Sequence, residues 1–179
     1  MARVLEEYDD PDGEPCRIRE AHPEDMAAVA SIYNQYLGRS TFDLVPKDAD
    51  QFAELMRRFE ADGRQELLVT ECGGEVPEVI GWGLIKRYSD REAYAGACET
   101  SVFFDEAHLR QGHGSRLKRL VLEECRRLGY HHVVAKIVAD NVAAIRYNER
   151  QGYEIVGVQR GIGLVEGRRI DVCILQRLL

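Results

Sequence analysis

A glycine-containing turn near the middle of the chain has the residue types and spacing of an anion-binding site. Gly112 and Gly114 lie in R-Q-G-H-G-S, residues 110–115, and glycine permits backbone N–H groups to approach a ligand closely. The preceding stretch, Thr100–Phe104, is β-branched and aromatic, as buried strands are. Apolar residues then follow at the spacing of one helix face: Leu117, Leu120, Val121, Cys125 and Leu128. A strand, a glycine turn and a helix N-terminus together predict a phosphate site.

Two familiar phosphate-binding motifs do not fit this turn. A P-loop needs a Lys-Ser/Thr pair after its second glycine, where Ser115 and Arg116 stand. A dinucleotide fold needs a third glycine, where Leu117 stands, and an acidic residue about twenty positions further on, where residues 133–136 lie. Six basic and two acidic side chains between positions 110 and 127, net +4, agree with a polyanionic ligand.

Composition limits the class of protein. With 179 residues, 45% apolar and 31% charged, the chain predicts one globular domain. The net charge is −7, of which residues 1–15 hold −5; this argues against nucleic-acid binding and predicts an acidic flexible tail over residues 1–15. No apolar run is long enough to span a membrane. Five scattered cysteines predict reduced thiols and a cytoplasmic location, and no Cys/His/Asp cluster has metal-ligand spacing, so we expect no metal.

The elements that must position the turn follow from periodicity. Strands are expected at residues 16–20, 67–72, 79–88, 100–104, 132–138, 153–159 and 170–177, the last two joined by a loop over 161–169. Helices are expected from Pro23, around Phe52–Phe59 up to Gly63, after Gly114 up to Leu128, and over 142–150. This order predicts a single mixed α/β domain over residues 16–179.

The turn and a later segment resemble the GNAT superfamily of N-acetyltransferases. The superfamily's acetyl-CoA motif, Gln/Arg-x-x-Gly-x-Gly/Ala, corresponds to residues 109–114, with Leu109 at the first polar position. The segment from Asn141 to Tyr153 is similar to its Asn-x-x-Ala-x-x-Leu-Tyr-Glu-x-x-Gly-Phe. In that segment the family's tyrosine often protonates the leaving thiolate, but here Asn148 stands in its place, and Tyr147 lies one residue early, about 100° round the helix.

Three segments resemble the phosphinothricin and methionine sulfone/sulfoximine acetyltransferase branch. They are I-Y-N-Q-Y-L-G-R-S-T-F-D (32–43), R-E-A-Y (91–94) and E-T-S-V-F-F (99–104). The branch commonly has histidine at position 148 and Trp-His at 169–170, so the departures here predict an altered acceptor pocket. The resemblance implies the GNAT (acyl-CoA N-acyltransferase) fold, a central, mostly antiparallel mixed sheet flanked by helices, and a homodimer.

The resemblance also assigns residues to roles. It implies cofactor contacts from Val102, Phe103, Phe104, Arg110, Gln111, Gly112, His113, Gly114, Ser115, Asn141, Ala144 and Tyr147. For Asn141, a structural role as the N-cap of the helix that follows explains the residue as well as a cofactor contact does.

Amide formation from a thioester requires a neutral amine, and Glu99 is placed to remove the ammonium proton. Arg91 and Tyr94 are candidates to bind an acceptor carboxylate, and Tyr33 and Phe42 to wall its pocket, although core packing explains Tyr33 equally well.

Three functions therefore remain open. The first is acetyl-CoA-dependent N-acetylation of a small amino-acid-like acceptor. The second is a regulatory acyl-CoA-binding module that has lost catalysis, which Asn148 favours. The third is acetylation of a protein amine.

Overall fold

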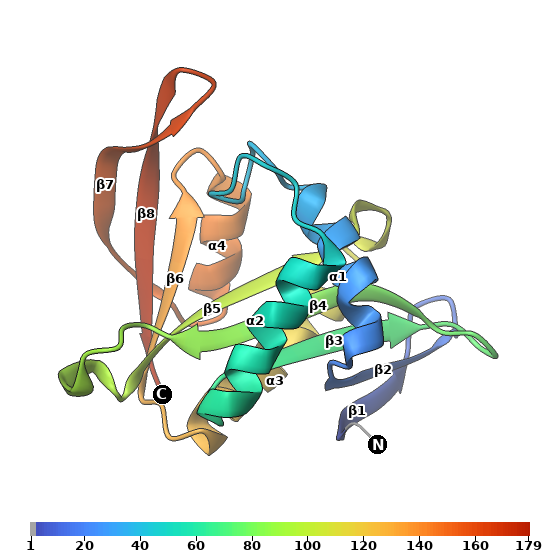
Figure 1. Ribbon diagram of the computed structural model, residues 1–179. Coiled ribbons are helices and arrows are strands. Elements are labelled where there is room, and N and C mark those ends of the chain that lie inside the picture. Colours follow the sequence, from blue (N-terminus) through green and yellow to red (C-terminus); the bar gives the residue numbers. More distant parts are fainter. Residues whose placement is uncertain (1–2) are drawn as a thin grey trace.

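The computed structural model describes residues 3–179, which form one eight-stranded sheet with helices on both faces (Figure 1). The strand order is β1-β2-β3-β4-β5-β6-β8-β7, antiparallel throughout except between β5 and β6. The strands are β1 (Val4–Asp9), β2 (Pro15–Glu20), β3 (Glu66–Cys72), β4 (Glu78–Arg87), β5 (Ala97–Phe104), β6 (His132–Val138), β7 (Glu154–Val165) and β8 (Arg168–Leu178). The helices are α1 (Met26–Asn34), α2 (Ala49–Asp62), α3 (His113–Arg127) and α4 (Val142–Arg150).

Two hydrophobic clusters fill the space between the sheet and the helices on its two faces. Helices α1 and α2 cover one face, where Trp82 of β4 packs against Phe52 of α2 with ring centroids 5.7 Å apart. Helix α3 covers the other face with the apolar residues that its sequence spacing predicts, and the buried Leu117 and Val121 lie over Gly83 of β4. This arrangement confirms the predicted mixed sheet flanked by helices. Among the described residues, no helix is both long and apolar enough to cross a membrane.

The N-terminal segment corrects the sequence prediction. A flexible tail was expected over residues 1–15, but Val4–Asp9 form β1, which pairs with β2, while Met1 and Ala2 lie outside the described residues. The apolar side chains of Leu5 and Tyr8 pack against the core. The acidic Glu6 forms ion pairs with two arginines of α3, one of them Arg116 at 2.8 Å. The acidic composition that predicted disorder therefore complements a basic helix.

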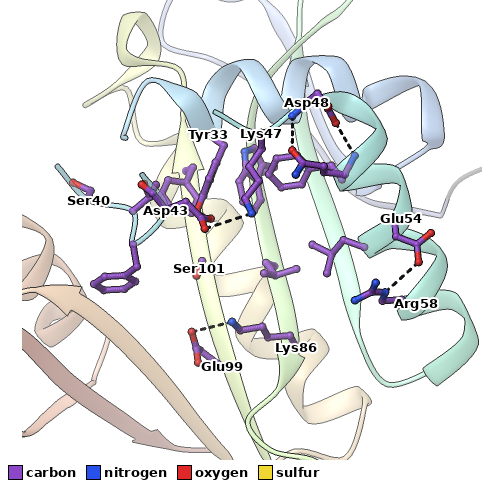
Figure 2. A pocket seen from close by; sticks show the side chains of 18 of the residues that line it. Tyr33, Ser40, Asp43, Lys47, Asp48, Glu54, Arg58, Lys86, Glu99 and Ser101 are labelled. Carbon is purple, nitrogen blue, oxygen red and sulfur yellow. Dashed lines mark hydrogen bonds and ion pairs between the residues drawn. The ribbon is translucent and has the colours of Figure 1, made fainter. Parts of the chain in front are cut away.

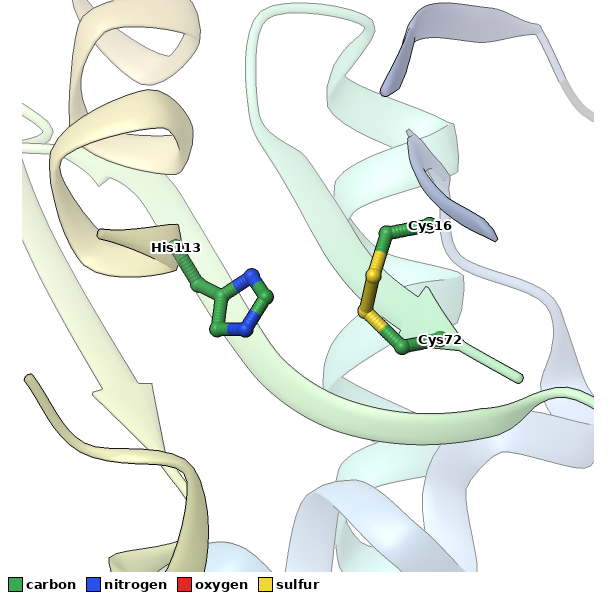
Figure 3. Close-up of side chains that lie close together, drawn as sticks. All are labelled: Cys16, Cys72 and His113. Atoms are coloured by element: carbon green, nitrogen blue, oxygen red, sulfur yellow. A yellow bond between two sulfur atoms is a disulfide. The ribbon is translucent and has the colours of Figure 1, made fainter. Parts of the chain in front are cut away.

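A disulfide joins Cys16 of β2 to Cys72 of β3, which corrects the prediction of five reduced thiols (Figure 3). The two residues face each other across antiparallel strands with Cα atoms 4.1 Å apart. The N–H of Gly73 donates to the carbonyl of Pro15, so the cysteines form a non-hydrogen-bonded pair, where side chains come closest. Cys98, Cys125 and Cys173 are buried free thiols.

The last two strands are longer than predicted. The segment expected as a loop over 161–169 continues both strands, and only Glu166 and Gly167 form the turn. Both turn residues have positive φ, 48° and 76°, as two-residue hairpins with matching strand twist require. The glycines at 161 and 163 lie inside β7, beside a break in its register with β8, rather than ending the strand.

Candidate active site

The parallel strands β5 and β6 separate part-way along their length. Their pairing covers Ala97–Glu99 opposite His132–Val134. Beyond these residues β5 runs on to Phe104, paired with β4 alone within the described part of the chain. A gap therefore opens inside the sheet, where backbone groups of β5 lack a neighbouring strand and can bind a ligand.

The peptide groups of β5 alternate between β4 and this gap. The Ala97 carbonyl accepts a hydrogen bond from the residue after β4, and the Asp105 N–H donates to a carbonyl of β4, so odd-numbered residues face β4. Val102 and Phe104 therefore present their N–H groups to the gap. The N–H of Phe103 faces β4, so among these three residues Phe103 can contribute its ring but not its amide.

The glycine turn leads directly into α3. Arg110 and Gly112 both have positive φ, 67° and 93°, and a Cβ added at Gly112 would meet no protein atom within 4 Å. Gly112 is the N-cap of α3 and offers no side chain to the first amides of the helix. The N–H groups at the start of α3 are thus available to an anion, and the open space above Gly112 lets it approach.

Two residues predicted to contact the cofactor point their side chains elsewhere. The His113 ring is buried, hydrogen-bonded to the Tyr8 hydroxyl at 2.7 Å and to Gln111 Oε1 at 3.2 Å, and stacked on Phe104. Burial lowers the pKa of His113, so a neutral ring is favoured between these partners. With their side chains paired in this way, His113 and Gln111 offer a cofactor chiefly their backbone N–H groups.

A cavity of about 570 Å³ runs from the glycine turn into the gap. Ten of the twelve predicted cofactor residues line it: Val102, Phe103, Phe104, Arg110, Gly112, Gly114, Ser115, Asn141, Ala144 and Tyr147. Its lining holds four cationic residues, Arg110, Lys118, Lys136 and Arg150, and no carboxylate. This charge suits a polyanion such as CoA. We name it the cofactor cavity.

A second cavity, of about 680 Å³, lies between β4, β5 and the segment linking α1 to α2 (Figure 2). We name it the acceptor cavity. Tyr33 and Phe42, the residues expected to wall an acceptor pocket, line it together with Trp82. The Tyr33 hydroxyl donates to Asp43 at 2.5 Å, and Asp43 also pairs with Lys47 at 3.4 Å. Tyr33 also packs on Trp82, so a role in the pocket wall is compatible with its packing in the core.

Glu99 lies in the acceptor cavity between two lysines. Its carboxylate is 3.2 Å from Lys86 Nζ and 2.7 Å from Lys136 Nζ, and its side chain is 12% exposed. The ion pair with Lys86 is visible at the cavity wall in Figure 2. A carboxylate held in this way is fixed in position, yet remains open to a ligand in the cavity.

The two cavities share four lining residues, Ser40, Ser101, Phe103 and Lys136. They meet where β5 leaves β6, one or two residues beyond Glu99. A group entering from the glycine turn and a group entering past Glu99 would therefore come together at this point.

Helix α4 brings Tyr147 and Asn148 to the cofactor cavity. The Tyr147 hydroxyl donates to the carbonyl of Gly114 at 2.8 Å, and burial raises its pKa to about 12. Asn148 is buried, its Nδ2 donates to the Ala144 carbonyl, and its Oδ1 lacks a partner among the described residues. Asn141 caps α4 through Ala144 N–H while it also lines the cavity, so both of its predicted roles are compatible.

The structure does not bring Arg91 and Tyr94 to either cavity of a single chain. Both are exposed in the loop between β4 and β5, where the Tyr94 ring packs edge-on against Tyr88. A role for them in acceptor binding requires a second subunit or a movement of this loop.

Sequence reasoning missed Lys118, which is buried in the wall of the cofactor cavity. Its Nζ donates to Thr100 Oγ1 at 3.1 Å and lies 4.5 Å from the centre of the Tyr153 ring. Desolvation lowers its pKa to about 8. A sequence signal for its burial was available, because Lys118 follows Leu117 and stands three residues before Val121, on a helix face that is otherwise apolar.

Cys16, Cys72 and His113 form the one group of three potential metal ligands found in residues 3–179, with ligand atoms within 4.8 Å of one another (Figure 3). Metal binding requires thiolates, which a disulfide does not offer. In this state the group is a disulfide between β2 and β3 with the His113 ring nearby rather than a metal site.

Comparison with known proteins decides the family. The sequence matches the Acetyltransferase (GNAT) family over residues 26–153. The chain belongs to the GNAT family. A phosphinothricin N-acetyltransferase of Streptomyces viridochromogenes is 33% identical to this GNAT chain over 169 residues, covering 93% of the chain and 90% of that protein. An L-methionine sulfoximine/L-methionine sulfone acetyltransferase of Pseudomonas aeruginosa is 29% identical over 161 residues, 89% and 92% of the two chains.

Solved structures agree. A Salmonella typhimurium protein determined with its cofactor acetyl-CoA matches this GNAT chain with a TM-score of 0.84 and 27% identity, covering 92% of this chain and 94% of that one. The predicted resemblance and fold are therefore confirmed. The chain is an acetyl-CoA-dependent N-acetyltransferase, for which acetyl-CoA is the co-substrate.

Proposed function

We propose that this enzyme acetylates the amino group of a small amino-acid-like acceptor by direct transfer, with Glu99 as the general base. The observation that carries the proposal is the position of Glu99 in the acceptor cavity, next to the point where the two cavities meet. Relatives whose names specify phosphinothricin or methionine sulfoximine and sulfone support an acceptor of this class.

The acceptor cavity has the charges that a zwitterion needs. Glu99 and Asp43 can attract an ammonium group, and Lys47, Lys86 and Lys136 line the same space. Acetyl-CoA supplies an activated acetyl group when bound. The chain's own contributions are to hold the phosphates at the glycine turn, to offer the Val102 and Phe104 N–H groups in the gap, and to accept the acceptor's proton at Glu99, directly or through one water.

Release of free CoA thiol from acetyl-CoA, measured with a panel of amino acids, amines and peptides, tests this proposal. We expect turnover with small amino acids or their analogues. Turnover only with peptides would favour acetylation of a protein amine. Tight acetyl-CoA binding without turnover on any acceptor would favour the regulatory module, the alternative that Asn148 suggests.

We also propose that the enzyme is a cytoplasmic homodimer. In support, β7 exposes a row of apolar side chains at the end of the sheet: Ile155, Val156, Val158, Ile162 and Leu164. One chain has a mass of 20.4 kDa, and light scattering should give twice that value. If β7 forms the interface, Val158→Asp should shift the protein from dimer to monomer. Cell fractionation tests the proposed cytoplasmic location.

A further inference from the structure

Catalysis by this chain lacks an evident acid for the leaving thiolate. Asn148 occupies the position where the family's motif has tyrosine, and an amide side chain donates no proton at neutral pH. The neighbouring Tyr147 directs its hydroxyl hydrogen to the Gly114 carbonyl. Tyr153 is buried behind Thr100 and hydrogen-bonded to it at 3.1 Å. None of these three side chains has a free acidic proton facing the gap.

Two lysines line the cofactor cavity, and Lys118 is the one without a carboxylate partner in residues 3–179, because Lys136 is paired with Glu99. The side chain is 3% exposed, lines the cofactor cavity, and uses one of its three N–H donors on Thr100 Oγ1. The charged and titratable groups that act on it are Cys98 of β5, Cys125 of α3 and Arg177 of β8, and it has no carboxylate partner in residues 3–179. A buried cation without a counterion weakens a fold, so packing alone does not account for this residue.

The position of Lys118 relative to Glu99 is informative. Thr100, its hydrogen-bond partner, follows Glu99 directly and is the first residue of β5 beyond the last pair with β6. Side chains alternate along a strand, so Glu99 faces the acceptor cavity while Thr100 faces α3. The carboxylate and the ammonium therefore approach the start of the gap from opposite faces of the sheet.

We propose that Lys118 is a catalytic residue that stabilises the departing CoA thiolate and protonates it. As the carbon–sulfur bond of the thioester breaks, its electron pair stays on sulfur, and the Lys118 ammonium transfers one proton to that sulfur. The acceptor nitrogen loses two protons on becoming an amide. One of them replaces, through solvent, the proton given by Lys118, and the other is released. The pKa of Lys118, lowered to about 8 by burial, is close to that of a thiol, about 8.5, which suits transfer in this direction near neutral pH.

This inference rests on the proposed path of the cofactor through the gap but not on Glu99 or on the acceptor. The test is therefore the pKa of the CoA thiol in the binary complex with CoA, followed by the ultraviolet absorbance of the thiolate. In the wild type the thiol pKa should lie about one unit or more below that of free CoA, the usual effect of an opposite charge within about 4–6 Å. Lys118→Met, of similar length but uncharged, should abolish this shift, while Glu99→Gln and Tyr147→Phe should keep it.

Kinetics provide the second measurement. Lys118→Met should lower kcat about 10²-fold or more. In the wild type kcat should decline above about pH 8 as Lys118 loses its proton. Lys118→Met should lack that decline, and Lys118→Arg, which keeps the charge, should retain the shifted thiol pKa. Equal thiol pKa values in the wild type and Lys118→Met would overturn the proposal, as would loss of the shift in Lys118→Arg. If Glu99→Gln loses activity but keeps the shifted thiol pKa, the result supports the role of Lys118 independently of the role of Glu99.

Discussion

The ammonium of Lys136 lies 2.7 Å from a carboxylate oxygen of Glu99, at the point where β6 turns away from β5. If Glu99 is the general base, Glu99→Gln should lower kcat by about 10²–10⁴, because a neutral amide accepts no proton from the acceptor. Measured against the wild type at the same pH, Glu99→Gln should recover part of its loss as the pH rises, because more of the amine is then already neutral. Calorimetry should show nearly unchanged acetyl-CoA affinity. Asn148→Ala serves as the comparison and should change kcat several-fold at most; the reverse ranking would contradict the assignment.

The glycine turn can be tested with a matched pair of substitutions. Gly112→Val places a side chain in the open space above the turn and strains a φ of 93°. Acetyl-CoA affinity measured by calorimetry should fall at least tenfold, about 1.4 kcal/mol. At Gly114 an added Cβ meets Phe104 and Tyr147 at ordinary contact distances of 3.8 Å, so Gly114→Ala should keep the affinity and raise the free energy of unfolding by about 0.5–1 kcal/mol. Unchanged binding in Gly112→Val would mean that the phosphates bind elsewhere.

Burial of Lys118 makes a prediction for stability against pH. Its pKa is about 8 in the folded protein and 10.5 when unperturbed, so the unfolded chain binds more protons between these pH values. Stability contributed by this group therefore rises with pH across that window, by about 3 kcal/mol in total. Chemical denaturation should show that Lys118→Met raises the free energy of unfolding most below pH 8. The difference from the wild type should narrow toward pH 10.5. A constant difference would mean that the lysine is not desolvated.

The disulfide between Cys16 and Cys72 should contribute measurably to stability. It joins residues 56 positions apart, so reduction or Cys72→Ser should lower the free energy of unfolding by about 2–4 kcal/mol. Denaturation with and without reductant measures this loss. Cys173→Ser, which removes a free buried thiol, should respond to reductant as the wild type does. If reductant leaves the wild type unchanged, the bond is absent in solution, as expected of most cytoplasmic proteins.

Arg91 tests whether the loop between β4 and β5 reaches an acceptor. If Arg91 binds an acceptor carboxylate in the assembled enzyme, Arg91→Ala should raise KM for carboxylate-bearing amines by about 30-fold or more, from a typical loss of about 2–5 kcal/mol. Amines without a carboxylate provide the internal control. Equal effects on both classes, or none on either, would leave Arg91 a surface residue, as it is in the single chain.

Much of the fold was predictable because its pattern is local. The apolar spacing predicted α3, and the glycines predicted the turn before it, which lines one end of the cofactor cavity. Strand β1 was missed because its inward residues, Leu5 and Tyr8, stand among acidic residues that resemble a flexible tail. One of these, Glu6, has arginine partners more than 100 positions away in the sequence. Lys118 was missed because a lysine in a basic segment looks like part of a solvated helix face. Its place beside Leu117 indicated the apolar face of the helix, and the packing of α3 against β5 shows that it is buried.

The early separation of β5 from β6 has a consequence for the protein without its co-substrate. Residues 100–104 of β5 have a paired strand on one side only, so the Val102 and Phe104 N–H groups have no strand partner on the other side among residues 3–179. A bound ligand that accepts the Val102 and Phe104 hydrogen bonds closes this edge from within. The co-substrate would then take part of the place of a neighbouring strand, and because it binds the folded chain, saturation should also raise the free energy of unfolding.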